Sequence, residues 1–271
     1  MDGGRGRAVS FRRVRGIPGA TEMKSPPTDR LAAALRVADD FEAMSRAAAD
    51  DIVSAVRRKP DAILCLATGG SPARAYDLLA EAARREPGLF ARVRAVKLDE
   101  WGSVAMDDPS TCEVYLREKV IGPLGIGPDR YLAWDTRPVD RDAECRRIAA
   151  WLEAHGPIDV CVLGLGANGH LGLNEPGASP DSGPHIETLA ESTRRHPMLA
   201  RARGRVDFGF TLGMADILKS RKVLLLVGGA AKAEPLRRLM SEPAGADFPA
   251  SLLRNHPNLA IHCDAEARGV L

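Results

Sequence analysis

The stretch "VLGLGANGHLGLNEPG", residues 162–177, places one histidine and one carboxylate in a glycine-rich loop that follows an apolar run. The imidazole of His170 titrates near neutral pH and can transfer a proton. The carboxylate of Glu175, five residues later, could orient that ring. The loop therefore predicts a proton-transfer site, with a simple packed histidine as the alternative. A metal site would need more ligands at suitable spacing, so we expect no metal here.

The same loop contains a GxGxxG pattern, which is typical of dinucleotide-binding folds. Gly164, Gly166 and Gly169 supply its three glycines. In such a fold the glycines open a helix directly, whereas Pro176 and Gly177 stand where this helix would run. The sequence therefore predicts that the glycines serve the histidine loop, and that the protein uses no dinucleotide or other cofactor.

A second candidate is the stretch "KLDEWG", residues 97–102, where two carboxylates end a predicted strand. Burial beside an aromatic side chain such as Trp101 raises the pKa of a carboxyl group and suits it to act as a general base. Adjacent residues of a strand point to opposite sides, so only one of Asp99 and Glu100 is expected to enter a site. The alternative is an acidic pair in a solvated loop.

Two further loops have the residue types that bind phosphate. "ATGGSP", residues 67–72, precedes a predicted helix and would present backbone N–H groups at its N-terminus. In "LVGGAAKAEPL" a lysine is expected just inside the helix that follows a strand. The residues predicted to bind phosphate are Thr68, Gly69, Gly70, Ser71 and Lys232. A base, a proton shuttle and two anion-binding loops together suggest aldose–ketose chemistry on a sugar phosphate.

These loops need a scaffold that brings them together, and the hydrophobic pattern supplies one. Apolar runs predict strands at 62–68, 93–98, 158–164, 222–229 and 259–264. Helices are predicted at 31–56, 72–85, 111–121, 142–156, 212–220 and 231–240. This alternation predicts an α/β fold, a single-domain, doubly wound, mostly parallel sheet with helices on both faces. Such a sheet binds its ligand at the carboxyl ends of its strands.

Composition limits the remaining possibilities. Of the 271 residues, the first 30 contain seven basic and three acidic side chains, so the remainder contains 31 basic and 33 acidic ones. This near-neutral remainder predicts neither nucleic acid nor membrane as a partner. Five cysteines without a CxxC pair favour reduced thiols and a cytoplasmic location. We expect a disordered tail over 1–28 and one domain over 29–271, with homo-oligomerisation left open.

Taken together, "LATGGSP", "LDEWG", "GLGANGHLGLNEPG" and "LLLVGGAAKA" resemble the glucosamine-6-phosphate deaminase/galactosamine-6-phosphate isomerase family. The resemblance extends from about residue 35 to residue 266. It implies deamination of a hexosamine 6-phosphate to a ketose 6-phosphate and ammonia. By this resemblance Asp99 removes the C2 proton, while His170, supported by Glu175, opens the sugar ring. The "TGGS" backbone, Ser71 and Lys232 would bind the phosphate.

The sequence departs from the best-known family pattern at one position and leaves others open. Asn168 stands where an Asp is usual, two residues before the histidine, and it lacks the negative charge that would stabilise an imidazolium. The family also uses an arginine in this region, for which the candidates are Arg194, Arg195, Arg201 and Arg203. Trp101 and the following "STCE" favour the galactosamine 6-phosphate members over the glucosamine 6-phosphate members.

Two alternatives to the deaminase are retained. The related 6-phosphogluconolactonases typically have an arginine after the Asp-Glu pair and a Ser-Leu-Phe-Pro run after Gly-His, and this chain has Trp101 and "LNEPG" instead. The other alternative is a non-catalytic module that senses a sugar phosphate. Ammonia release would distinguish the deaminase from both.

Overall fold

The computed structural model describes residues 27–189, 191–194 and 197–269. The helices are α1 Pro27–Ala34, α2 Phe41–Arg58, α3 Gly70–Arg85, α4 Cys112–Leu116, α5 Arg141–His155, α6 Glu191–Arg194, α7 Met214–Leu218, α8 Ala233–Ser241 and α9 Ala265–Arg268. The strands are β1 Leu35–Ala38, β2 Ile63–Leu66, β3 Arg94–Lys97, β4 Asp99–Trp101, β5 Tyr131–Leu132, β6 Val160–Gly164, β7 His185–Thr188, β8 Phe208–Thr211, β9 Val223–Val227 and β10 Leu259–Asp264. None of the helices described is long and apolar enough to cross a membrane.

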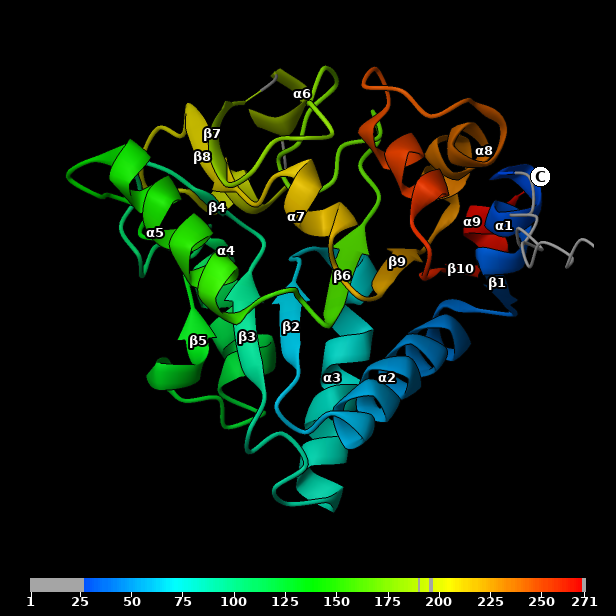
Figure 1. The fold of residues 1–271 in the computed structure, drawn as a ribbon, viewed down its shortest axis with the longest axis horizontal. Helices are drawn as coiled ribbons and strands as arrows, with labels where there is room; N and C mark the ends of the chain where they lie inside the picture. Colours follow the sequence, from blue (N-terminus) through cyan, green and yellow to red (C-terminus); the bar gives the residue numbers. More distant parts are fainter. Residues whose placement is uncertain (1–26, 190, 195–196, 270–271) are drawn as a thin grey trace, which may run out of the picture.

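Seven of these strands form the main sheet, in the order β1-β10-β9-β6-β2-β3-β5, with every neighbouring pair parallel (Figure 1). After β2 the chain adds β3 and β5 on one side and then returns to place β6 on the other. The strand order therefore reverses between β2 and β6. In an open α/β sheet this switch point is where ligands bind, so the topology marks the loops after β2 and β6.

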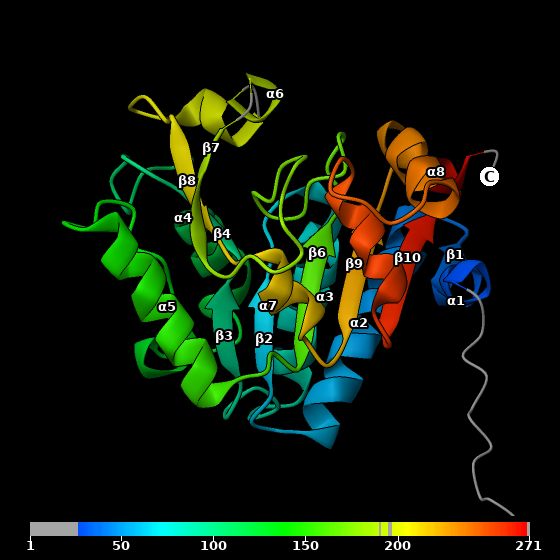
Figure 2. The same cartoon turned by 45° about the horizontal axis from the view of Figure 1, so that its top comes forward.

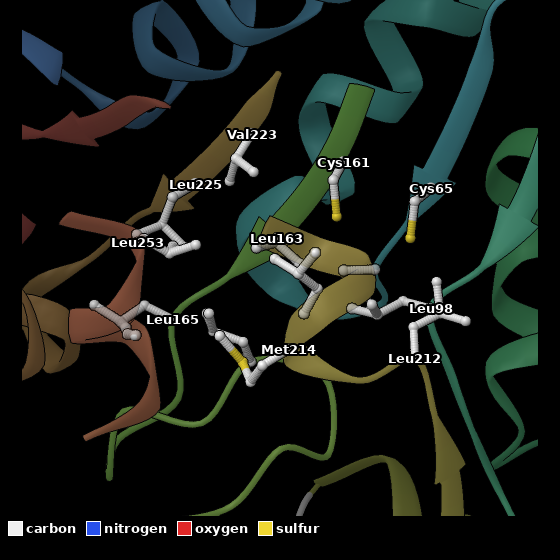
Figure 3. Close-up of a cluster of buried hydrophobic side chains, with 14 of the residues drawn as sticks. Cys65, Leu98, Cys161, Leu163, Leu165, Leu212, Met214, Val223, Leu225 and Leu253 are labelled. Carbon is white, nitrogen blue, oxygen red and sulfur yellow. The ribbon is translucent and has the colours of Figure 1, made fainter. Parts of the chain in front are cut away.

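The main sheet is buried on both faces because successive residues of its strands alternate between two hydrophobic cores. In β6, Val160 and Val162 pack against α2 and α3, whereas Cys161 and Leu163 pack on the opposite face with α5, α7 and α8. Figure 3 shows Leu163 on this second side, among side chains from neighbouring strands and from α7. The doubly wound arrangement with helices on both faces is confirmed.

A second, antiparallel sheet of three strands, in the order β4-β8-β7, was not expected from the sequence. It lies beyond the carboxyl ends of β2 and β3 (Figure 2). Leu98 separates β3 from β4, so Asp99 and Glu100 belong to a new strand rather than to the end of the preceding one. The antiparallel pairing of β4 with β8 fixes the directions in which these two carboxylates point.

The predicted helix over 31–56 is helical at both ends but is not continuous, because Leu35–Ala38 forms the edge strand β1 beside β10, between α1 and α2. Pairing with β10 outweighs the local helical pattern, and Asp40 then begins α2 by accepting a hydrogen bond from the N–H of Ala43 at 2.7 Å. The expected tail over 1–28 also ends too late, since α1 begins at Pro27; residues 1–26 lie outside the described part. Lys232 precedes α8 as its N-cap residue rather than lying inside the helix.

Candidate active site

A cavity of about 890 Å³ opens at the carboxyl ends of the main-sheet strands. The loops that follow β1, β2, β3, β6, β9 and β10 contribute to its wall. Eight of the residues predicted from the sequence line it: Thr68, Gly69, Gly70, Ser71, Asp99, Asn168, His170 and Lys232. The structure thus brings together residues from four segments that are separate in the sequence, namely those that follow β2, β3, β6 and β9.

Asp99 lies in the cavity wall with 8% of its surface exposed, next to Leu98 and Trp101. Burial, together with a smaller effect of Glu100, raises the pKa of its carboxyl group to about 7, although Lys97 opposes the change. A carboxyl group that titrates near neutral pH can remove a proton from carbon more effectively than one that titrates near 4. Glu100 is fully buried and points into the protein instead, so only one of the two carboxylates enters the cavity, as predicted.

Asn168, His170 and Glu175 form a connected group in the loop after β6. The Asn168 amide donates a hydrogen bond to Glu175 Oε2 at 2.8 Å, and its Oδ1 accepts the N–H of His170 at 3.2 Å. His170 Nδ1 lies 3.8 Å from the same Glu175 oxygen. The hydroxyl of Thr193 donates to the other oxygen of Glu175. Glu175 does not itself line the cavity but lies behind His170 as its carboxylate neighbour.

The loop keeps this group in place through its backbone. Gly169 has a φ of +86° and lies against the ring of Phe248, so a residue with a Cβ would be both strained and blocked there. Asn174 is fully buried and donates to the carbonyl oxygens of Leu171 and Leu212, at 2.8 and 2.9 Å. No helix follows β6, because the chain continues through this loop to β7. The rejection of a dinucleotide site is consistent with this path.

The first of the two loops predicted to bind phosphate leads directly into α3. Gly69 is the N-cap residue of α3 with a φ of +120°, and Gly70 and Ser71 form the start of the helix. The first N–H groups of a helix lack partners within the helix and attract anions. The phenol of Tyr115 donates to the Gly69 carbonyl at 2.8 Å and fixes the loop from behind.

Lys232 lies on the other side of this cavity, after β9. Its Nζ donates to the carbonyl of Leu165 at 2.7 Å, which directs the ammonium group toward the histidine loop. Burial lowers the pKa of this ammonium group. Among the described residues that line the cavity, Lys232 is the one Lys or Arg. Asp264 holds the adjoining backbone by accepting the N–H of Gly229 at 2.8 Å.

The predicted arginines do not reach this cavity as far as the structure describes them. Arg194 donates from Nε to the carbonyl of Leu189 at 3.0 Å, and Arg201 and Arg203 are exposed. None of these three lines the cavity, and Arg195 lies outside the described residues. Sequence reasoning also missed Thr193, because a lone Thr carries no pattern that would indicate its bond to Glu175.

The chain matches the family model described as glucosamine-6-phosphate isomerases/6-phosphogluconolactonase over residues 38–261. A glucosamine-6-phosphate deaminase of Geobacillus is 38% identical over 236 residues, covering 85% of this chain and 92% of the relative. A glucosamine-6-phosphate deaminase of Bacillus subtilis is 36% identical over 231 residues, covering 84% and 95%.

Solved structures show the same relationship. A monomeric glucosamine-6-phosphate deaminase superposes with a TM-score of 0.82 at 34% identity, covering 86% of this chain and 98% of the other. The 6-phosphogluconolactonase of Trypanosoma brucei gives 0.69 at 20% identity, covering 86% and 96%, which establishes a shared fold. The resemblance seen in the sequence motifs is confirmed: the chain belongs to the glucosamine-6-phosphate isomerase/6-phosphogluconolactonase family.

Proposed function

We propose that the protein is an enzyme that converts a hexosamine 6-phosphate into a ketose 6-phosphate and ammonia. The observation that supports this most directly is the position of Asp99, a buried carboxyl group with a pKa of about 7, in the same cavity as His170 and two anion-binding loops. Relatives that cover most of the chain are named glucosamine-6-phosphate deaminases, which agrees with the proposal.

In the proposed reaction Asp99 accepts the C2 proton of the open-chain amino sugar, while a proton passes from the C2 ammonium group of the substrate to its carbonyl oxygen at C1. The product is an enolamine with a C1–C2 double bond. The protonated Asp99 then returns its proton to C1, which leaves a C2 iminium ion. Water adds to C2 and ammonia leaves, giving the ketose. A base with a pKa near the working pH suits both proton transfers.

The other residues would act before and around this step. His170 would move the proton that opens the sugar ring, with Glu175 and Asn168 holding the loop in position. The backbone of Gly69, Gly70 and Ser71, the hydroxyl groups of Thr68 and Ser71, and Lys232 would bind the phosphate. All five cysteines are free and buried, which agrees with the cytoplasmic location that we propose.

The test assays three compounds side by side: ammonia release is measured from galactosamine 6-phosphate and glucosamine 6-phosphate, and hydrolysis is measured for 6-phosphogluconolactone, which contains no nitrogen. We expect ammonia from at least one amino sugar phosphate, with the galacto epimer favoured because Trp101 and "STCE" resemble the galactosamine 6-phosphate members of the family. Asp99→Asn should reduce turnover by at least about 100-fold while phosphate binding is retained. Hydrolysis of the lactone without ammonia release would establish the lactonase instead, and binding without any turnover would establish the sensing module.

A further inference from the structure

Lys97, two residues before Asp99, is a fully buried lysine outside the cavity. Its Nζ donates to Glu100 Oε2 at 2.7 Å, to Glu113 Oε2 at 2.8 Å and to the carbonyl of Trp134 at 3.3 Å. Burial favours the neutral amine, but the two glutamates outweigh burial and raise the pKa of Lys97. The two carboxylate partners therefore keep the side chain of Lys97 protonated.

Glu100 connects this lysine to the beginning of α4. Its two oxygens accept the backbone N–H groups of Trp101, Cys112 and Glu113 at 2.8, 2.9 and 2.9 Å. The side chain is fully buried. Since Trp101 belongs to β4 and the other two donors open α4, Glu100 locks the strand that carries Asp99 against this helix.

Glu113 completes the group on its outer side. Besides Lys97, its Oε2 accepts the phenol of Tyr131 at 3.0 Å, and its Oε1 forms an ion pair with Arg117 Nε at 2.5 Å. Burial acts to raise the pKa of Glu113, but Lys97 and Arg117 outweigh it and lower the pKa. The buried cluster of Lys97, Glu100 and Glu113 thus links β3, β4, β5 and α4 directly behind the cavity wall.

The cluster also contains the charges that act on Asp99. Burial is the largest cause of the raised pKa of Asp99. Of the neighbouring charges, Glu100 raises this pKa and Lys97 lowers it. The other titratable groups around Asp99 are the thiols of Cys65 and Cys112 and the phenol of Tyr76, whose pKa values burial raises, so they stay neutral. Across the cavity are His170 and Lys232.

We propose that Lys97, Glu100 and Glu113 are positioning residues that fix the direction of Asp99 and whose charges act on its carboxyl group from behind the cavity wall. This inference rests on the proposed function for its role in catalysis, but its electrostatic part concerns the protein alone. Glu100 and Lys97 change the pKa of Asp99 in opposite directions. Removing each charge in turn should therefore shift this pKa in opposite directions. A merely structural role would predict lower activity or stability in both variants, without opposite shifts.

The experiment compares Lys97→Met with Glu100→Gln. We expect Lys97→Met to raise the pKa of Asp99 and Glu100→Gln to lower it, each by about 1 unit. The readouts are the acid limb of kcat/KM for ammonia release and NMR titration of the Asp99 carboxyl in ¹³C-aspartate-labelled protein, assigned with Asp99→Asn. Lys119→Met is the control, because Lys119 forms a comparable ion pair with Asp77 at 2.9 Å on a half-exposed surface. It should leave both readouts unchanged.

Shifts in the same direction, or no shift, in the two variants would overturn the inference. If Lys97→Met does not fold, Lys97→Met/Glu113→Gln removes one charge of each sign and leaves Glu100 held by its three backbone donors. This variant has to show the same upward shift. An inactive wild type would refute the proposed function alone, since the NMR titration needs no turnover.

Discussion

Gly166 lies directly against the imidazole of His170, with no room between them for a side chain. A Cβ on Gly166 would come within 2.5 Å of His170 Cγ and Nε2, far inside van der Waals contact. The N–H of Gly166 also donates to the carbonyl of His170 at 3.1 Å, which closes the loop on itself. The position of the ring therefore depends on the absence of a side chain four residues earlier.

We expect Gly166→Ala to displace His170 and to reduce kcat by about 10-fold or more, since small displacements of a catalytic group are costly. Phosphate binding should change little. The control is Gly183→Ala, where a Cβ meets open space and the residue lies outside the cavity wall. Unchanged kcat in Gly166→Ala would mean that the ring of His170 is not held by this contact.

The main sheet was predictable from the sequence because its strands are buried on both faces and appear as short apolar runs. β6 and β9 are of this kind, with nearly every residue buried. β1 was missed because it is an edge strand whose central residues are exposed, so its composition resembles a helix. The strands β4, β7 and β8 are only three or four residues long, and their pairing joins segments far apart in the chain.

The candidate residues of the site were predictable because loop chemistry is local, whereas their partners were not. Asp99 and His170 each stand in a distinctive short motif, soon after β3 and β6 respectively, and the strand order brings these two motifs to one cavity. The bond from Thr193 to Glu175, and the cluster around Lys97, depend on tertiary packing that no spacing in the sequence indicates. For the same reason the arginine candidates remained open, and three of them lie away from the cavity wall.

Asp99 should reduce the stability of the protein as the pH rises. Its pKa is about 7 in the folded protein and ordinarily 3.8, so the folded state binds the proton more tightly between these values. Stability is then lost as the pH rises from about 4 to 7, by up to about 4 kcal/mol. Asp99→Asn lacks this titration. The free energy of unfolding of the variant minus that of the wild type should therefore increase as the pH rises through this range. Urea unfolding at pH 4.5 and 8 measures the difference, and an equal difference at both pH values would show that the pKa is not raised.

Removal of the cation in the cavity wall should weaken phosphate binding. Lys232→Met is expected to raise the Kd for inorganic phosphate by about 10-fold or more, because a hydrogen bond to a charged group contributes about 1.5–3 kcal/mol. Calorimetric titration measures this, with Lys232→Arg expected to restore part of the affinity. The control is Lys219→Met, which changes an exposed lysine outside the cavity wall. An unchanged Kd in Lys232→Met would show that phosphate binds at another site, away from Lys232.

The hydrogen bond between Asn168 and Glu175 predicts how single and double substitutions at these two positions change the activity. In Asn168→Asp the donating amide becomes a carboxylate 2.8 Å from Glu175 Oε2, and two like charges then face one another. In Glu175→Gln the amide of Asn168 loses its charged acceptor. Each single variant should reduce kcat/KM for the cyclic substrate by about 10-fold or more.

The double variant Asn168→Asp/Glu175→Gln reverses the direction of the bond and keeps one negative charge beside His170. It should therefore recover much of the activity, with a coupling of about 1–3 kcal/mol between the two positions in a double-mutant cycle. Thr193 can still donate to the amide oxygen that Glu175→Gln introduces, so the connection to α6 is retained. If the two losses simply add, the carboxylate at Glu175 acts on His170 independently of Asn168, and the bond between them does not contribute to ring opening.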